Sequence, residues 1–225
     1  LIKEPPLLTG KALLARQGVL RHSPPMPRFH LVSLFPEFFQ SPLSTALMGR
    51  AREAGLVDFS FHDPREFSTS KHRHVDDRPY GGGPGMVMQG EPLAAALRSI
   101  GQPGRILLMT PGGRPLTQNM AAELAREEDL TIVCGRYEGI DQRFIDKNVT
   151  HQLSLGDFVL SGGELAAMVL LDSLARLQPG VLNDEGSFQQ DSFNPALDGL
   201  LDCPHYTRPE QWNGQDVPAE LLSGH

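Results

Sequence analysis

Residues 154–164 read Ser-Leu-Gly-Asp-Phe-Val-Leu-Ser-Gly-Gly-Glu, and this stretch decides the fold. A strand-like apolar run breaks at Gly156, a second short apolar run breaks at Gly162 and Gly163, and a helix pattern begins at Glu164. Glycine lets a backbone turn sharply and lets a ligand touch main-chain atoms. The pattern therefore favours a loop around a flat, partly polar ligand such as an adenosine, although Gly-Gly before a helix is also typical of an ordinary tight turn.

A second stretch, Ile-Val-Cys-Gly-Arg-Tyr-Glu-Gly-Ile-Asp at residues 132–141, repeats this layout of buried strand, glycine, polar turn and helix start. Glu138 lies in this turn between two glycines. Its carboxylate would either neutralise a cationic ligand or cap the helix that follows. The sequence leaves both roles open.

The rest of the chain alternates between strand and helix patterns. We expect strands over residues 29–34, 57–61, 105–109, 130–134 and 149–155. We expect helices over 36–54, 91–100, 117–126 and 164–177, with Thr117 as a cap. This alternation predicts an α/β fold with a mostly parallel sheet. The glycine turns at 110–113, 135–139 and 156–163 would lie beyond the carboxyl ends of strands, where such sheets bind ligands.

Composition indicates a globular chain with no membrane span. Apolar residues make up 40% of the 225 residues and charged residues 21%, and no apolar run approaches 18 residues. The two cysteines, Cys134 and Cys203, are far apart, and Cys134 lies in an apolar strand pattern. We therefore expect a buried, reduced thiol and a cytoplasmic location.

The charge distribution is uneven along the chain. The net charge of −7 argues against a generic nucleic-acid binder. Residues 181–225 carry eight acidic side chains against Arg208 alone, so residues 1–180 are neutral overall. A neutral body can still present a local basic face.

Four segments follow from these patterns. Residues 1–25 read as an N-terminal extension outside the fold, with Met26 as the natural start and an amphipathic transit peptide as the alternative. Residues 26–182 form the main domain, 183–195 a flexible linker, and 196–225 a smaller unit with little apolar material. Residues 63–85 read as a long polar loop, which is typical of a functional or disordered segment.

Several common sites are excluded by their missing residues. The chain has no Gly-x-Gly-x-x-Gly after its first strand, no P-loop lysine and no metal-binding spacing of cysteines or histidines. Residues 71–78, Lys-His-Arg-His-Val-Asp-Asp-Arg, are either a solvated loop or an RNA-facing surface. In the second case Arg and Lys would hold phosphates and Asp76 would accept a hydrogen bond from a base edge.

Two further charged residues allow two interpretations each. Arg176 lies four residues after Asp172, which suits an ion pair on a helix or a cation that meets developing negative charge. Asp191 lies in the expected linker, where an exposed loop acid is the reading from composition alone.

Five stretches together resemble the bacterial tRNA (guanine-N1-)-methyltransferase family, of the knotted SPOUT class, over about residues 29–224. They are Val-Ser-Leu-Phe-Pro-Glu at 32–37, Val-Asp-Asp-Arg-Pro-Tyr-Gly-Gly-Gly-Pro-Gly-Met at 75–86, and residues 133–141, 156–165 and 199–209. The resemblance implies a C-terminal trefoil knot that holds S-adenosylmethionine, a homodimer with active sites at the subunit interface, and a magnesium requirement. It implies methylation of N1 of the guanosine immediately 3′ of the tRNA anticodon. It also implies a small α-helical C-terminal tRNA-binding domain, of which residues 196–225 would be a truncated part.

The resemblance also assigns roles to individual residues. The cofactor would contact Pro111, Gly135, Tyr137, Glu138, Leu155, Gly156, Asp157, Phe158, Val159, Leu160, Gly162 and Gly163. Asp191 would be the general base and Arg176 the catalytic arginine, while the RNA substrate would contact His72, Asp76 and Gly85.

These residue types suit the implied chemistry. Guanine N1 carries a proton, which a carboxylate can accept as the methyl group transfers. Charge then develops on O6, where a guanidinium stabilises it. Two alternatives stay open: a non-catalytic RNA-binding or regulatory protein of the same fold, suggested by the acidic tail, and a nucleotide-using kinase-like enzyme, which lacks its phosphate lysine.

Overall fold

The computed structural model describes residues 26–182 and 191–223. Its centre is a five-stranded sheet in the order β2–β1–β6–β5–β7, in which every neighbouring pair runs parallel. The strands are β1 (Arg28–Val32), β2 (Asp58–His62), β5 (Arg105–Pro115), β6 (Asp129–Cys134) and β7 (His151–Ser154). The predicted α/β class with a mostly parallel sheet is confirmed.

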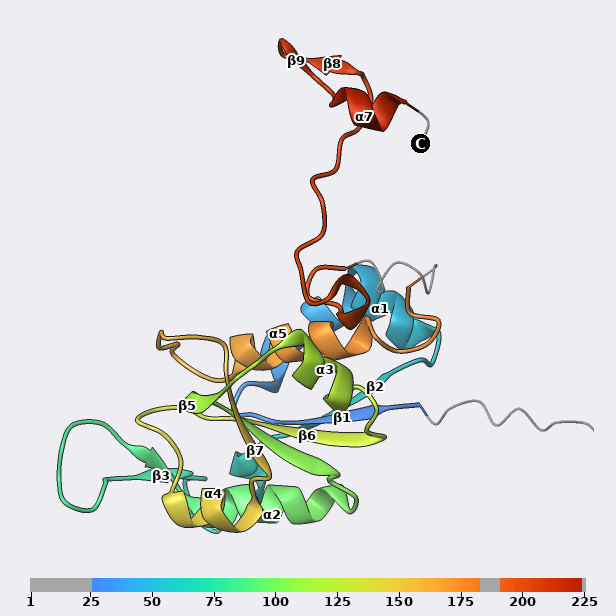
Figure 1. The fold of residues 1–225 in the computed structure, drawn as a ribbon. Coiled ribbons are helices and arrows are strands. Elements are labelled where there is room, and N and C mark those ends of the chain that lie inside the picture. The colour runs from blue at the N-terminus through green and yellow to red at the C-terminus, as the bar shows by residue number, and fades with distance from the viewer. Residues whose placement is uncertain (1–25, 183–190, 224–225) are drawn as a thin grey trace, which may run out of the picture.

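Helices cover both faces of this sheet (Figure 1). On one face lie α1 (Ala46–Glu53), α3 (Gln118–Leu124) and α5 (Glu164–Ala175). On the other lie α2 (Gly90–Ile100) and α4 (Gln142–Asn148). The strands separate two hydrophobic cores, because successive side chains point to opposite faces. Leu31 and Ile132 pack toward α5, whereas Val32 and Val133 pack toward α2.

The sequence predicts one helix over residues 36–54, but the structure does not contain a continuous helix there. The chain forms two 3₁₀ turns, η1 (Pro36–Phe39) and η2 (Pro42–Ser44), before α1 begins. Pro42 has no N–H to donate, and the Thr45 hydroxyl donates to the carbonyl of Ser41. Ala46 has a φ of +51°, which a continuous right-handed helix cannot contain.

The expected turn at residues 110–113 interrupts a strand that is longer than predicted. Met109 and Arg114 both align with Leu153 of β7, so the four residues between them leave the ladder. This excursion projects from the carboxyl end of the sheet and then returns to it. Beyond it, the Thr117 side chain accepts a hydrogen bond from the amide of Met120, which confirms the predicted cap of α3.

The predicted loop at residues 63–85 contains more structure than the sequence indicates. It includes the 3₁₀ turn η3 (Pro64–Phe67) and leads into a hairpin of β3 (Asp76–Asp77) and β4 (Val87–Met88). The amide of Met88 donates to the carbonyl of Gly139 at 2.9 Å, and Asp141 donates to Met88 at 3.0 Å. The hairpin is thereby fixed to the turn that follows β6.

Residues 191–223 contain η4 (Pro195–Leu197), a hairpin of β8 (Gln211–Trp212) and β9 (Gln215–Asp216), and α7 (Ala219–Leu222). Figure 1 shows β8, β9 and α7 apart from the sheet. The α-helical domain and the knot stay predictions. The expectations for residues 1–25 and for most of the 183–195 linker fall outside the described residues. None of the helices in the described ranges combines the length and apolar character that a membrane crossing needs.

Candidate active site

A cavity of about 410 Å³ opens at the carboxyl ends of β5, β6 and β7. Three segments line it: residues 108–111, residues 135–140, and most of residues 152–163. These are the three glycine turns of the sequence, and each follows a buried strand of the same parallel sheet. Their meeting at one edge follows from the strand order, since β5 lies between β6 and β7.

The structure gathers eleven of the twelve predicted cofactor residues around this pocket. They are Pro111, Gly135, Tyr137, Glu138, Leu155, Gly156, Phe158, Val159, Leu160, Gly162 and Gly163. The twelfth, Asp157, is exposed and does not line the cavity. The binding role of all twelve stays a prediction.

Direct backbone contact holds two of the lining segments together. The amide of Gly163 donates to the carbonyl of Gly135 at 2.9 Å. A Cβ atom at Gly163 would lie 2.8 Å from Cα of Cys134. Glycine is therefore needed here for close approach to the end of β6, in addition to any approach of a ligand.

An ion pair beneath the pocket was not foreseen from the sequence. Nη2 of Arg136 lies 2.9 Å from Oε2 of Glu164, whose side chain is 1% exposed. The guanidinium also lies 4.4 Å from the centre of the Phe35 ring and donates to the carbonyl of Ser161. The second oxygen of Glu164 accepts from Ser33 Oγ at 2.7 Å. No signal in a single sequence links residues this far apart.

The Arg136–Glu164 ion pair affects the net charge of the pocket. Arg136 and Glu138 are the charged side chains among its lining residues. Because Glu164 neutralises Arg136, the carboxylate of Glu138 leaves the pocket with a negative charge, which suits a cationic ligand. Asp141 caps α4 by accepting from the amide of Arg143, so Glu138 does not take the capping role that the sequence left open.

Cys134 lies behind this pair and is fully buried. Burial raises the pKa of its thiol well above the ordinary value, and the Glu164 carboxylate raises it further. The thiol is therefore neutral and unreactive, as the apolar strand pattern predicts.

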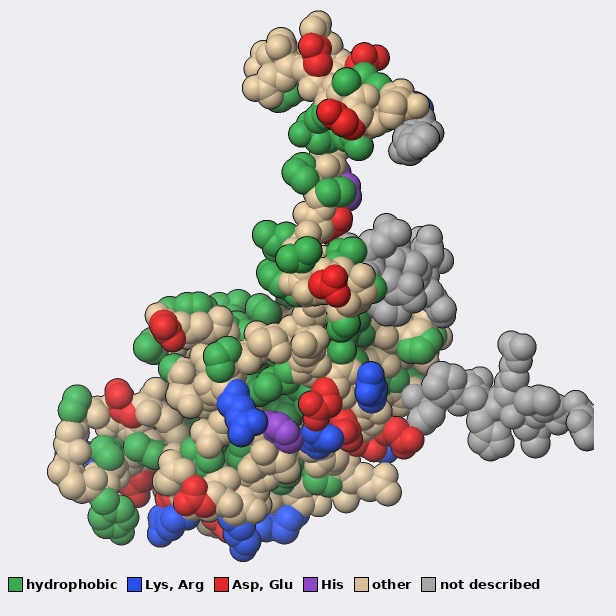
Figure 2. Space-filling view, in the orientation of Figure 1, with side chains coloured by type: hydrophobic (Ala, Val, Ile, Leu, Met, Phe, Trp, Pro, Cys, Tyr) green, Lys and Arg blue, Asp and Glu red, His purple; other side chains and the backbone are tan. Residues whose placement is uncertain are grey.

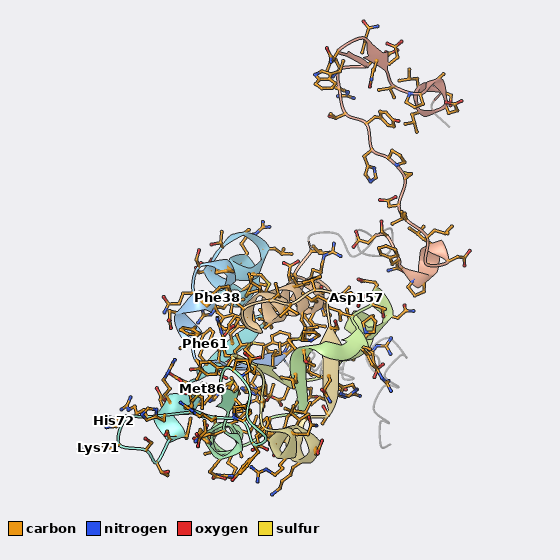
Figure 3. The ribbon with its side chains drawn as sticks, turned by 90° about the vertical axis from the view of Figure 1, so that its left-hand side faces the viewer. Phe38, Phe61, Lys71, His72, Met86 and Asp157 are labelled. Atoms are coloured by element: carbon orange, nitrogen blue, oxygen red, sulfur yellow. The ribbon has the colours of Figure 1, made fainter. Side chains whose placement is uncertain are left out.

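The predicted RNA-binding residues are only partly brought to the pocket. Gly85 has a φ of +82°, and a Cβ atom there would lie 2.4 Å from Cγ of Glu138. Asp76 aligns with Met88 in the hairpin that is fixed to the same turn. His72 is exposed, and Figure 3 shows it beside Lys71 at one edge of the molecule, across the view from Asp157.

The structure brings the two predicted catalytic residues together, away from the pocket. Nη1 of Arg176 lies 2.5 Å from Oδ2 of Asp191, so the ion pair involves Asp191 and not Asp172. Arg176 follows the last residue of α5, whereas Gly163 and Ala166 of the pocket lie at its first turn. A 12-residue helix spans about 18 Å, so Arg176 lies at the opposite end of α5 from the pocket, and neither Arg176 nor Asp191 lines it.

Exposed apolar side chains lie on α5 and its adjoining loop, between the pocket and Arg176. Leu165 and Val169, four residues apart on one face of α5, are 53% and 48% exposed. Phe158 and Val159 of the adjoining loop are also exposed. Figure 2 shows hydrophobic side chains gathered over this loop and the neighbouring part of α5. We call Phe158, Val159, Leu165 and Val169 the α5 face.

Comparison with known proteins gives a consistent result. A family model described as tRNA (Guanine-1)-methyltransferase TrmD matches residues 27–225. The tRNA (guanine-N(1)-)-methyltransferase of Albidiferax ferrireducens is 59% identical over 203 residues, which cover 88% of this chain and 82% of that protein. The protein of the same name from Paracidovorax citrulli is 57% identical over 206 residues, which cover 88% and 81%.

Proposed function

This chain belongs to the tRNA (guanine-1)-methyltransferase family, and we propose that it transfers a methyl group from S-adenosylmethionine to N1 of a guanosine in tRNA. It is a methyltransferase, and the comparisons give no support to the non-catalytic alternative. The single observation that carries the proposal is the family match over residues 27–225. The resemblance further assigns the target as the guanosine immediately 3′ of the anticodon, and we also propose a cytoplasmic location.

The lining and the charge of the pocket support the proposed methyl donor. Its walls are largely backbone and apolar side chains, as a flat adenine ring requires, with Glu138 at the edge. S-adenosylmethionine carries a sulfonium and an ammonium group, and a carboxylate favours both. When bound, this molecule supplies an activated methyl group, so the protein has only to position it against guanine N1.

The separation of Arg176 from the pocket supports the proposed homodimer. A two-fold axis that crosses α5 near its middle would place the C-terminal end of one α5 beside the N-terminal end of the other. Arg176 and Asp191 of one chain would then complete the pocket of its partner. The α5 face provides an apolar surface for this contact, since Leu165 and Val169 are exposed in the single chain.

The ion pair suggests how the two catalytic residues would work. The ion pair holds the carboxylate of Asp191 beside the Arg176 guanidinium, and a carboxylate can accept the proton that leaves guanine N1. The guanidinium, released from Asp191 as the proton arrives, can then stabilise the charge that develops on guanine O6. Both groups would act from the end of α5, which holds Arg176 in place.

The remaining features of the proposal rest on the resemblance. They are the trefoil knot around the pocket, the tRNA-binding role of the C-terminal unit and the magnesium requirement. Among residues 26–182 and 191–223, no group of three or more His, Cys, Asp or Glu side chains could hold a metal ion. We therefore assign no step to a metal.

A single-turnover reaction tests the activity. The protein is mixed with S-adenosylmethionine and an unmodified tRNA transcript that has guanosine immediately 3′ of the anticodon, and digested nucleosides are separated by mass. We expect N1-methylguanosine from this transcript and none from a transcript with adenosine at that position. A failure of the first transcript to react would overturn the proposal, and equal methylation of other guanosines would overturn the assigned position.

Mixing two inactive variants tests the shared site. Asp191→Asn removes the base, and Gly163→Val removes the pocket. A mixed dimer would contain one intact pocket facing one intact Asp191 from the other chain. We expect activity to return on mixing, to about a quarter of the wild-type rate if dimers form at random. No recovery after verified subunit exchange would mean that each chain uses its own Asp191.

A further inference from the structure

The Arg136–Glu164 pair lies against the predicted methyl-donor pocket but touches it through one partner only. Arg136 lines the cavity, whereas Glu164 does not and is 1% exposed. Gly162 packs so closely over the guanidinium that a Cβ atom there would lie 2.2 Å from Nε of Arg136. The cation is thus fixed at the wall of the pocket, with its counter-ion behind it.

Burial makes this pair electrostatically important. Nε of Arg136 and Oε2 of Glu164 are buried and, within the described part of the chain, form no hydrogen bond. Their charges therefore cancel mainly through one contact of 2.9 Å between Nη2 and Oε2. The Arg136 side chain is 21% exposed, so loss of the carboxylate would leave a partly buried cation without its ion-pair partner at the wall of the pocket, where its field acts on a bound ligand.

The methyl donor and its product respond differently to such a field. S-adenosylmethionine carries a positive sulfonium, whereas S-adenosylhomocysteine has a neutral thioether in the same position. The two molecules share their adenosine and their amino-acid group. A cation at the pocket wall therefore repels the donor more than the product.

We propose that Glu164 is a positioning and charge-balancing residue that, by neutralising Arg136, makes the pocket accept the cationic methyl donor in preference to its neutral product. This inference rests on the proposed function. It adds a residue that does not touch the ligand and acts on it through Arg136. It also gives Arg136 a role in holding Ser161 and Gly162 in place.

Glu164→Gln tests the inference, because glutamine keeps the shape and the hydrogen bond to Ser33 but removes the charge. Dissociation constants of donor and product are measured by calorimetry at pH 8. We expect the ratio of donor affinity to product affinity to fall by about fivefold or more. If Glu164 had a purely structural role, the substitution would weaken the binding of both ligands equally and leave the affinity ratio unchanged.

Two further variants are expected to change the affinity ratio differently from Glu164→Gln. Arg136→Gln alone leaves the Glu164 carboxylate uncompensated, so the ratio should rise in favour of the donor. The double variant Arg136→Gln with Glu164→Gln has no charge at either position and should return the ratio to near the wild-type value. If Glu164→Gln alone does not fold, the affinity ratios of these two variants still test the inference.

Glu91→Gln is the matched control. Glu91 also lies in the first turn of a helix and pairs with an arginine, Arg98, at 2.6 Å, but it is exposed and does not line the pocket. We expect this variant to leave the affinity ratio unchanged. A ratio that is equal in all variants would overturn the inference, whereas failure of the wild-type protein to bind either ligand would overturn the proposed function instead.

Discussion

The guanidinium of Arg176 and the carboxylate of Asp191 are 2.5 Å apart, and both are about one-third exposed. In the proposed mechanism this pair separates when guanine arrives, so that Asp191 can accept the proton of N1 and Arg176 can stabilise the charge on O6.

Asp191→Asn should abolish methyl transfer and leave methyl-donor binding intact, because an amide cannot accept the proton. We expect the single-turnover rate to fall by roughly 10²–10⁴-fold with an unchanged dissociation constant for S-adenosylmethionine. Asp198→Asn is the control, since Asp198 is exposed in the same segment and its φ of +51° is tolerated by asparagine. Near-normal turnover by Asp191→Asn would remove this residue from the mechanism.

Gly163→Ala should weaken both the pocket and the fold. The added methyl group would lie 2.8 Å from Cα of Cys134, and a backbone atom in a central strand cannot move aside easily. We expect the free energy of unfolding in urea to fall by about 1–3 kcal/mol, with weaker donor binding by calorimetry. At Gly112, where an added Cβ meets no atom within 4 Å, the same substitution should leave both quantities unchanged.

Val169→Asp should convert the proposed dimer to a monomer. Burial of an unpaired charge on the α5 face would cost more free energy than the apolar contact provides. Sedimentation should show the mass of one chain, and methyl transfer should be lost because Arg176 and Asp191 no longer reach the second pocket. Leu221→Asp, which changes an exposed leucine of α7, is the control, and its sedimentation should still show the mass of a dimer. A dimeric Val169→Asp variant would place the interface elsewhere.

Stability should decline below about pH 6.5 through His62. Burial lowers the pKa of this histidine, and nearby His30 lowers it further. Because the folded pKa lies below the unfolded value, the stabilisation is present above pH 6.5 and is lost as the pH falls through the folded pKa.

The measurement is the urea unfolding free energy at several values between pH 7.5 and 5. His62→Gln can keep the contact with Ser60 Oγ, which lies 2.9 Å from Nε2, but cannot take up a proton in this range. Its stability should therefore fall less steeply with decreasing pH than that of the wild type. His74→Gln, on the exposed loop, serves as the control. Identical slopes for wild type and His62→Gln would assign the pH dependence to another group.

The mostly parallel sheet and the pocket edge could be anticipated because they depend on local patterns. Buried strands that end in glycine turns, at Gly135 and Gly156, lead to the same edge of a parallel sheet whatever lies between them. The amphipathic run at 91–100 likewise predicts α2 to within one residue. These elements are specified by residues close together in the chain.

Features that depend on distant residues could not be anticipated. Arg136 and Glu164 are 28 positions apart, and the packing of the loop before α5 against the end of β6 brings them together. The break at Ala46 depends on how Pro42 and the nearby hydroxyl groups compete with helical hydrogen bonds. The distance of Arg176 from the pocket is a property of α5 in three dimensions, which residue types alone do not reveal.

The length of α5, which is 12 residues, also determines the distance between its two ends. One end carries the proposed cofactor loop and the other carries Arg176, so in the proposed dimer the helix length determines how each chain is placed to contribute to two sites. A single alanine inserted after Leu170 would shift the far end by about 1.5 Å and rotate it by about 100°. Such an insertion could preserve donor binding and still uncouple it from catalysis, so this helix should tolerate exchanges of residues on its surface far better than any change in their number.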